Sequence, residues 1–149
     1  NIQEVIIQNF RAKTRTRMHN REEPTTVDML RTLATARLVF GESVNIQAPP
    51  NLNSDGCQTY ILAGINDWGG VSPVTKDHIN PEAPWPAIEH LRHLTEECGY
   101  QLRERLAIYP EFVFGENADF APSLSKALSL QMADVGYNGV TEERHCGQN

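Results

Sequence analysis

The sequence predicts an α/β fold with a parallel sheet, forming the end of a larger (β/α) barrel. Short apolar runs rich in β-branched residues alternate with segments of helical periodicity along the chain. Alternating strands and helices form parallel sheets with right-handed crossovers. Three such units are too few to close a barrel, and as an open sheet they would expose two apolar edges. We therefore expect further strands outside this chain.

Three segments are predicted as strands. Residues 4–10 hold three consecutive β-branched aliphatic residues before turning polar, which is typical of a parallel strand buried on both faces. Residues 44–48 form the second strand, because the two prolines that follow cannot continue a sheet. Residues 65–71 form the third and run into a pair of glycines. Glycines at that place allow close approach of the backbone to whatever lies opposite.

The clearest helix is predicted over residues 26–40. Thr25 and Thr26 follow a proline and are suitable N-caps, and Asp28 lies in the first turn. Apolar residues then recur at helical spacing until Gly41, a natural stop. Further helices are predicted through Cys57, Tyr60 and Ile61, over 88–98 and over 124–135.

The last third of the chain is less regular. Residues 100–108 are predicted as an extended segment or edge strand that Pro110 ends. Gly136 is predicted to stop the final helix, and residues from 137 onward to form a tail. The chain also opens without a methionine and begins a strand almost at once, so we expect a fragment of a longer protein.

Composition narrows the classes of function. The net charge of −6 argues against a general nucleic-acid binder. No run approaches the roughly 18 apolar residues of a membrane span, and no signal peptide is recognisable. The three cysteines, Cys57, Cys98 and Cys146, are too widely spaced for a metal knuckle or a redox dithiol. We expect free thiols, no metal ligands in this chain, and a cytoplasmic location.

Polar side chains gather at the ends of the three predicted strands. They are Gln8, Asn9 and Arg11 after the first, Gln47 and Asn51 after the second, and Asn66, Asp67, Trp68 and Ser72 at the third. In parallel α/β folds, ligands bind at the carboxyl ends of the strands. Amides both donate and accept hydrogen bonds, a carboxylate accepts from a sugar hydroxyl or an amine, and an indole offers a flat face. A small-molecule site for a heterocycle or a ribose is therefore predicted there.

A structural alternative stays open for these residues. Asp67 could tie the following loop, and Trp68 could pack at the top of the barrel. Gln47 could be a satisfied buried amide, and Asn9 and Arg11 could pair with neighbouring loops.

The charged segment 11–23 has no apolar periodicity and is predicted as a loop. Two interpretations are open: a solvated basic loop, or a lid that faces an anion such as phosphate.

Five segments carry a distinctive pattern: IQEVIIQNFRAK (2–13), LATARLVFG (33–41), NIQAPPNL (45–52), AGINDWGGVSPVTKDHINPEAPWP (63–86) and LRERLAIYPEFV (102–113). Together they resemble the radical S-adenosylmethionine enzymes that form the deazaflavin FO, the FO synthases, and specifically their ring-closing half. The stretch 65–86 is highly specific, whereas several related radical enzymes share something like TARLVFG.

The resemblance implies the last βα units of a radical S-adenosylmethionine TIM-type barrel over residues 1–113. Residues 114–149 would form a carboxyl-terminal helix and a tail or linker. It further implies a lyase in which a [4Fe–4S] cluster cleaves S-adenosylmethionine to a radical. That radical would close the ring of a tyrosine–ribitylaminouracil adduct with loss of ammonia. A companion radical enzyme, or a fused second half, would supply the adduct.

The resemblance also implies roles for individual residues. Gln8, Asn9 and Arg11 would face the nucleoside part of the cofactor, and Gln47, Asn51, Asn66, Asp67 and Trp68 the substrate. The family holds its cluster on three closely spaced cysteines, a motif that this chain does not match. We therefore expect the cluster ligands in the absent part of the barrel, and no activity from this chain alone.

Two other functions are compatible with the pattern. One is another radical relative, of the menaquinone-pathway type, which would lack NDWGGVSP. The other is a non-catalytic α/β module that binds a small molecule and folds alone. In every case the expected partner is a small molecule, and neither nucleic acid nor a membrane.

Overall fold

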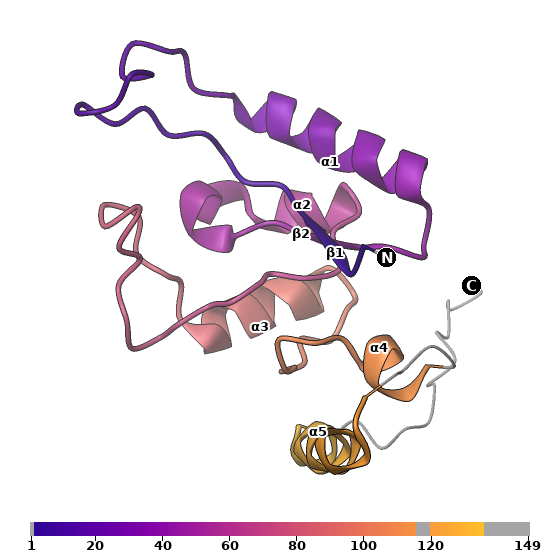
Figure 1. The fold of residues 1–149 in the computed structure, drawn as a ribbon. Coiled ribbons are helices and arrows are strands. Elements are labelled where there is room, and N and C mark those ends of the chain that lie inside the picture. Colours follow the sequence, from indigo (N-terminus) through magenta and orange to yellow (C-terminus); the bar gives the residue numbers. More distant parts are fainter. Residues whose placement is uncertain (1, 116–119, 136–149) are drawn as a thin grey trace. The chain divides into compact units, whose positions relative to one another are not determined.

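The computed structural model describes residues 2–115 and 120–135. The chain divides into two compact units between Leu102 and Arg103. The first unit holds the elements β1 (Glu4–Ile6), α1 (Thr26–Phe40), β2 (Asn45–Gln47), a 3-10 segment η1 (Pro50–Gly56), α2 (Gln58–Leu62) and α3 (Ile88–Glu97) (Figure 1). The second unit holds α4 (Pro110–Phe114) and α5 (Pro122–Asp134).

The sheet of the first unit is parallel and small. β1 pairs with β2, so that Glu4 lies opposite Asn45 and Ile6 opposite Gln47. A parallel bridge joins Gln47 to Asp67, which brings the third predicted strand beside β2. The predicted α/β class with parallel pairing is confirmed. Within the described residues, this sheet has two strands and one bridge, and it does not form a barrel.

The strands are shorter than predicted, and the third reduces to the bridge at Asp67. The side chain of Asn66 explains this reduction. Its Oδ1 accepts the Ile46 N–H at 2.8 Å, a bond that a backbone carbonyl would accept in a longer ladder. The expectation that the first strand is buried on both faces was wrong, because Ile6 is 54% exposed.

Helix α1 has the predicted bounds, and local capping explains them. The Thr25 side chain accepts from the Asp28 N–H, and the Asp28 carboxylate accepts from the Thr25 N–H, which is a capping box. At the other end Gly41 has a φ of 63°, a conformation that favours glycine.

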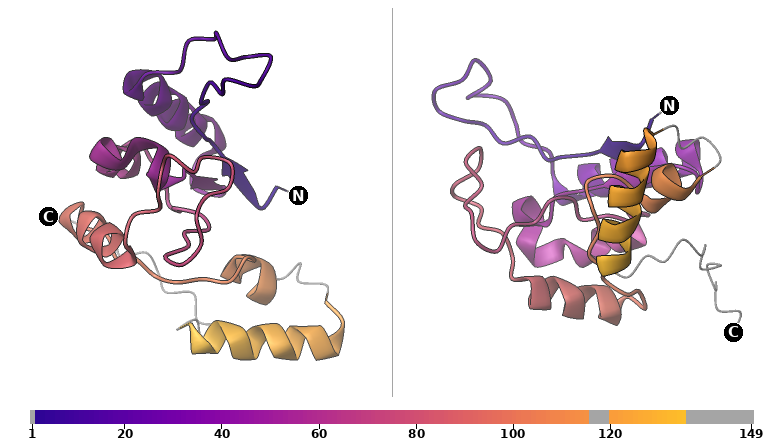
Figure 2. Two further views of the ribbon diagram at one scale, coloured as in Figure 1. Left: turned by 90° about the vertical axis from the view of Figure 1, so that its left-hand side faces the viewer. Right: turned by 60° about the horizontal axis from the view of Figure 1, so that its bottom comes forward.

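The core of the first unit lies between β2 and the helices α1, α2 and α3. In the left view of Figure 2, α1, α2 and α3 follow one another along one side of this unit. The buried side chains come from all of them: Met29 and Leu33, Ile46 and Ala48, Tyr60 and Ile61, Trp68 and Leu91. Because side chains alternate along a strand, Ile46 and Ala48 face this core and Gln47 faces the opposite side.

The second unit corrects one prediction. The edge-strand alternative for residues 100–108 was wrong, and Pro110, which was predicted to end that segment, is the first residue of α4, where a helix needs no N–H. No strand forms over residues 100–108. Helix α5 is confirmed, whereas the stop predicted at Gly136 and the tail from residue 137 lie outside the described residues. None of the helices described has the length and apolar character of a membrane span.

Candidate functional site

The chain segments that follow β1, β2 and the bridge at Asp67 line a polar cavity of about 480 Å³. Two predicted site residues, Arg11 and Asn51, line it. The full lining is Arg11, Ala12, Glu23, Asn51, Leu52, Asn53, Glu82, Ala83 and Pro84. The first six of these residues follow the carboxyl ends of β1 and β2, and the last three follow the bridge at Asp67. This is the edge where α/β folds bind ligands.

Asn51 is the most buried polar residue of this cavity, with 5% of its surface exposed. Its Nδ2 donates to Asp77 Oδ2 at 3.0 Å and to the Ala83 carbonyl at 3.1 Å. Its Oδ1 is buried and has no hydrogen-bond partner among the described residues. With less than 1 Å² of exposed surface, this oxygen is a buried acceptor that the described residues leave unpaired.

Asp77 holds Asn51 in this orientation. Its carboxylate also accepts from the Ile79 N–H and from the backbone and side chain of Asn80. Burial alone would raise the pKa of Asp77, but the bonds from Asn80, Ile79 and Asn51 outweigh it and lower the pKa from 3.8 to about 2. Asp77 is thus a carboxylate at neutral pH and a fixed acceptor for the Asn51 amide.

The charges at the cavity are paired. Arg11 Nη1 donates to Glu23 Oε2 at 2.8 Å, and Nη2 donates to the Leu52 carbonyl at 2.6 Å. Lys13 forms an ion pair with Glu82. The bonds from Arg11 and the Ala12 N–H lower the pKa of Glu23, and the bond from Lys13 lowers that of Glu82. For Arg11, the alternative of pairing with a neighbouring loop is therefore confirmed.

The other residues predicted to face the cofactor lie nearby on the chain but differ in their contacts. Gln8 is exposed. Asn9 is partly buried, and its Oδ1 accepts from the hydroxyl of Tyr60 at 3.1 Å. Burial raises the pKa of Tyr60, so this hydroxyl stays protonated and donates. Asn9 thereby ties the segment after β1 to α2.

Asn66 lies in a second network, away from the cavity lining. Its Oδ1 accepts from the Ile46 N–H and, at 3.0 Å, from Arg37 Nη2, and its Nδ2 donates to Asn45 Oδ1 at 2.6 Å. Arg37 also donates to the Gly64 and Val44 carbonyls. This network joins α1 to two segments of the sheet, β2 and the residues just before the bridge at Asp67.

Gln47 and Asp67 lie side by side on the sheet face opposite the helical core. Gln47 is 9% exposed, and Gly69 lies directly against its side chain. A Cβ at Gly69 would overlap the Gln47 amide, and the φ of 78° favours glycine as well. The Asp67 carboxylate accepts from the Gly69 N–H and so holds this turn, as the structural alternative for Asp67 predicted.

Trp68 belongs to the core. It is 7% exposed, and its Nε1 donates to Thr95 Oγ1 at 3.2 Å, a residue of α3. The indole ring therefore packs in the core, as the structural alternative for Trp68 predicted. Ser72, also predicted at this end, accepts from the Thr75 N–H within its own loop.

Three carboxylates of the site were missed from sequence: Glu23, Asp77 and Glu82. Asp77 has a local signal, because an aspartate before an asparagine at the third following position is typical of a side-chain-capped turn. Glu23 and Glu82 lie 12 and 69 residues from the cations with which they pair, and no local pattern predicts such pairs.

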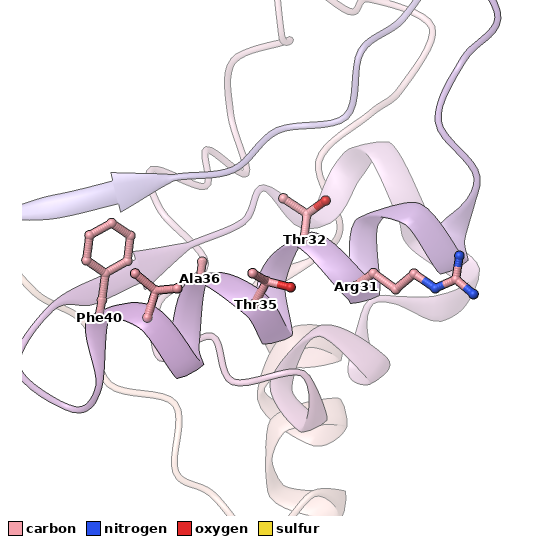
Figure 3. A pocket seen from close by; sticks show the side chains of 6 residues that line it. Arg31, Thr32, Thr35, Ala36 and Phe40 are labelled. Atoms are coloured by element: carbon pink, nitrogen blue, oxygen red, sulfur yellow. The ribbon is translucent and has the colours of Figure 1, made fainter.

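A second hollow, of about 410 Å³, runs along α1 (Figure 3). Its lining comes from that helix alone: Arg31, Thr32, Thr35, Ala36, Val39 and Phe40. A single helix face without convergent polar groups from another element is a weaker candidate for a ligand site than the polar cavity.

An iron–sulfur cluster does not fit the described part of the chain. There, no three His, Cys, Asp or Glu side chains are placed to hold a metal ion. Cys57 is buried in the core, and this burial raises the pKa of its thiol, which disfavours the thiolate that a metal needs. Cys146 lies outside the described residues.

These features define an α/β protein with a polar cavity at the carboxyl ends of parallel strands. The comparisons with known proteins make the class specific. Over 112 residues, 75% of its length, the chain is 62% identical to the 7,8-didemethyl-8-hydroxy-5-deazariboflavin synthase of Methanopyrus kandleri. It is 57% identical to the enzyme of that name from Methanococcus aeolicus, and 50% identical to that of Methanobrevibacter smithii.

The aligned three quarters of this chain is therefore homologous to the 7,8-didemethyl-8-hydroxy-5-deazariboflavin synthases, and the resemblance seen in the sequence is confirmed. The chain spans about a third of the length of these relatives, between 31% and 33%. No family model and no solved structure matches it.

Proposed function

We propose that this chain is part of a radical S-adenosylmethionine enzyme that forms the deazaflavin FO. The reaction is closure of the deazaflavin ring of a tyrosine–ribitylaminouracil adduct, with release of ammonia. The observation that carries the proposal is the 62% identity to a synthase of that name over 112 residues. The relatives from Methanopyrus, Methanococcus and Methanobrevibacter all carry the synthase name, which favours this function over the menaquinone-pathway alternative.

The proposed fold of the whole enzyme is a (β/α) barrel. Residues 1–113 supply its last βα units, and residues 114–149 a carboxyl-terminal helix and a tail or linker. Parallel pairing of β1 with β2 and the bridge from Gln47 to Asp67 support a barrel segment. The helices α1, α2 and α3 cover one face of these segments, as helices do around such a barrel.

The enzyme would use S-adenosylmethionine and a [4Fe–4S] cluster. The cluster supplies the electron that generates the radical, and its ligands belong to the part of the protein outside this chain. This chain contributes polar side chains at the strand ends. Gln8, Asn9 and Arg11 would contact the nucleoside part of the cofactor, and Gln47, Asn51, Asn66, Asp67 and Trp68 the substrate.

The geometry supports these roles unequally. Asn51 lines the polar cavity, whereas Trp68 is buried in the core and donates to Thr95 of α3. The partners of the enzyme would be the small-molecule substrate and a companion tyrosine-ligating subunit, or a fused second half.

Replacing Asp67 tests the proposed site in the full-length protein. We expect Asp67→Asn to lower FO formation while the iron and sulfide content stays unchanged, because the amide accepts hydrogen bonds less strongly than the carboxylate. The measurements are FO fluorescence with supplied adduct and iron analysis of the reconstituted enzyme.

The matched control is Asp134→Asn, at an exposed position of α5. It makes the same chemical change outside the proposed site and should leave FO formation unaltered. If Asp67→Asn also forms FO at the original rate, Asp67 is not a site residue. If the original enzyme forms no FO from the adduct, the proposed function itself is wrong.

A further inference from the structure

The segment between β1 and α1 concentrates positive charge on one exposed loop. Residues 11–23 contain five Arg or Lys side chains and two glutamates, in a chain whose net charge is −6. Figures 1 and 2 show this segment running out from the helices of the first unit as a long loop. Residues 15–21, the tip of this loop, are all exposed. The loop is therefore a basic surface on an otherwise acidic chain.

Ion pairs hold the base of this loop. Arg11 pairs with Glu23, whose other carboxylate oxygen accepts from the Ala12 N–H at 2.8 Å. Lys13 pairs with Glu82, which lies 69 residues away in the chain. These contacts tie the two ends of the loop to each other and to a distant segment, so the loop leaves the protein from a fixed base.

Turns order the tip of the loop. The N–H and the hydroxyl of Thr16 both donate to the Lys13 carbonyl, at 3.0 and 2.9 Å. The Thr16 carbonyl in turn accepts from the N–H and from Nδ1 of His19. A further turn is closed by the Arg21 N–H, which donates to the Met18 carbonyl at 2.9 Å. A surface that is ordered before binding loses less conformational entropy when a partner docks.

Three guanidinium groups of the tip are left over by this internal bonding. Among the described residues, no carboxylate pairs with Arg15, Arg17 or Arg21. None of the three lines the polar cavity, so they do not converge on a small anion there. Small ligands bind in concave sites, whereas arginine and methionine are enriched where proteins meet. Met18, which is 48% exposed, lies between these arginines in the sequence. The tip thus has the composition of a protein-docking surface.

A nucleic acid fits this surface less well than a protein does. Residues 11–23 contain no Phe, Tyr or Trp on which a base could stack. A nucleic acid also carries negative charge along its whole length, and beyond the loop it would meet a chain of net negative charge. A folded protein can confine its carboxylates to a patch that matches the loop in size.

We propose that residues 15–21 dock another protein through a patch of aspartate and glutamate side chains around an apolar residue. The carboxylates pair with Arg15, Arg17 and Arg21, and the apolar residue contacts Met18. Exposed ion pairs contribute little each, so we expect a transient complex that forms quickly and weakens with salt. The inference goes beyond the proposed function, which assigns no residue of this chain to a protein partner.

The experiment measures binding of a fluorescent peptide to the full-length protein by fluorescence anisotropy. The probe carries acidic residues on both sides of a central leucine, and its neutral control carries asparagine and glutamine in their place. We expect the neutral peptide to bind at least tenfold more weakly than the acidic one. A single-stranded RNA of equal charge should displace the probe at least tenfold less effectively than unlabelled acidic peptide, and inorganic phosphate should not displace it.

Substitutions locate the binding. Replacing Arg15, Arg17 and Arg21 together by alanine should weaken binding of the acidic peptide about tenfold. Replacing all three by glutamate should reverse the preference, so that a peptide with lysines in place of the acidic residues binds instead. Met18→Ser should weaken binding of the probe more than binding of an acidic peptide without the leucine. The matched control Arg31→Ala removes an exposed arginine of α1 and should bind as before.

The reversal by glutamate distinguishes a lost contact from a misfolded variant, and circular dichroism of each variant provides a second check. Equal binding of the acidic and neutral peptides, or unchanged binding in the triple alanine variant, would overturn the proposal. Stronger displacement by RNA than by peptide would replace it with a nucleic-acid site, and displacement by phosphate with a small-anion site. Self-association that the triple variant abolishes, measured by sedimentation, would replace it with a contact between copies of this protein. None of these measurements uses FO formation, so the inference is tested separately from the proposed function.

Discussion

Two asparagines that follow neighbouring strand segments have opposite surroundings. Asn66 belongs to the most specific stretch of the sequence, and its side chain makes three hydrogen bonds, to Ile46, Arg37 and Asn45. Asn51 belongs to a less specific stretch, and its side chain donates twice but accepts nothing from the described residues. A distinctive sequence pattern therefore does not by itself distinguish an amide with all its hydrogen bonds made from one with an unpaired oxygen among the described residues.

The difference follows from where each amide stands relative to backbone groups. Asn66 lies beside a strand whose Ile46 N–H needs an acceptor, and its side chain supplies one. Asn51 lies in η1, beyond the end of β2, where no strand continues. Its donors reach the loop at Asp77 and Ala83, and its oxygen is buried without a partner among the described residues.

The largest expected effect is on stability at Asn66. Asn66→Ala should lower the free energy of unfolding by about 2–3 kcal/mol, because it removes the acceptor of the Ile46 N–H and one hydrogen bond each from Arg37 and Asn45. Asn51→Ala should cost about 1 kcal/mol, because it removes two donors and no satisfied acceptor. Urea unfolding followed by circular dichroism gives both values.

Hydrogen exchange provides a local check on this comparison. The Ile46 amide should lose protection in Asn66→Ala and keep it in Asn51→Ala, since only Asn66 accepts from it. Equal stability losses in the two variants, with Ile46 equally protected, would remove the distinction between the two asparagines.

The parts of the fold that depend on neighbouring residues could be predicted from the sequence. Helix α1 begins after Thr25 and ends before Gly41 as expected, because its capping box and its positive-φ glycine act within one turn. The length of the third strand could not be predicted, because Asn66 replaces a backbone acceptor for a residue 20 positions away. The helix that begins at Pro110 was not predicted, because proline both ends strands and opens helices.

The candidate site likewise has features that could be predicted from the sequence and features that could not. The sequence predicted Arg11 and Asn51 as site residues because both follow predicted strands. The carboxyl ends of parallel strands lie at one edge of the sheet, and both residues line the cavity there. The hydrogen-bond partners of these side chains could not be predicted. Asn51, for example, is oriented by Asp77, which lies 26 residues away in the sequence. Pairing of Lys13 with Glu82 spans 69 residues, and it decides which charges remain for a ligand.

A smaller effect is expected from acid, through the carboxylate that orients Asn51. The pKa of Asp77 is lowered from 3.8 to about 2 in the folded protein, so its contribution to stability is complete above about pH 4. It is lost as the pH falls from there towards 2, because the folded state then binds a proton less readily than the unfolded state. Asp77→Asn should flatten this part of the stability profile.

Urea unfolding at intervals between pH 5 and pH 2 measures that change, since each midpoint can be compared between the two proteins. Above pH 5, Asp77 is charged in both the folded and the unfolded state. There the stability of the original protein and that of Asp77→Asn should change with pH in the same way. Identical profiles in the original protein and in Asp77→Asn would show that Asp77 does not gain from its hydrogen bonds, and the fixed orientation of Asn51 would lose its support.

The smallest effects are expected in the basic loop, where Arg11 lines the cavity and Arg15 and Arg17 do not. Arg15 and Arg17 are exposed, and Arg15→Ala and Arg17→Ala should each change the free energy of unfolding by less than about 0.5 kcal/mol. Arg11→Ala should cost about 1 kcal/mol, because it removes the bonds to Glu23 and to the Leu52 carbonyl. Urea unfolding at low and at high salt distinguishes the effect of Arg11→Ala from the effects of Arg15→Ala and Arg17→Ala. If Arg15→Ala costs as much as Arg11→Ala, the loop is held by more than Arg11 and Lys13, and the boundary of the cavity must be extended to include it.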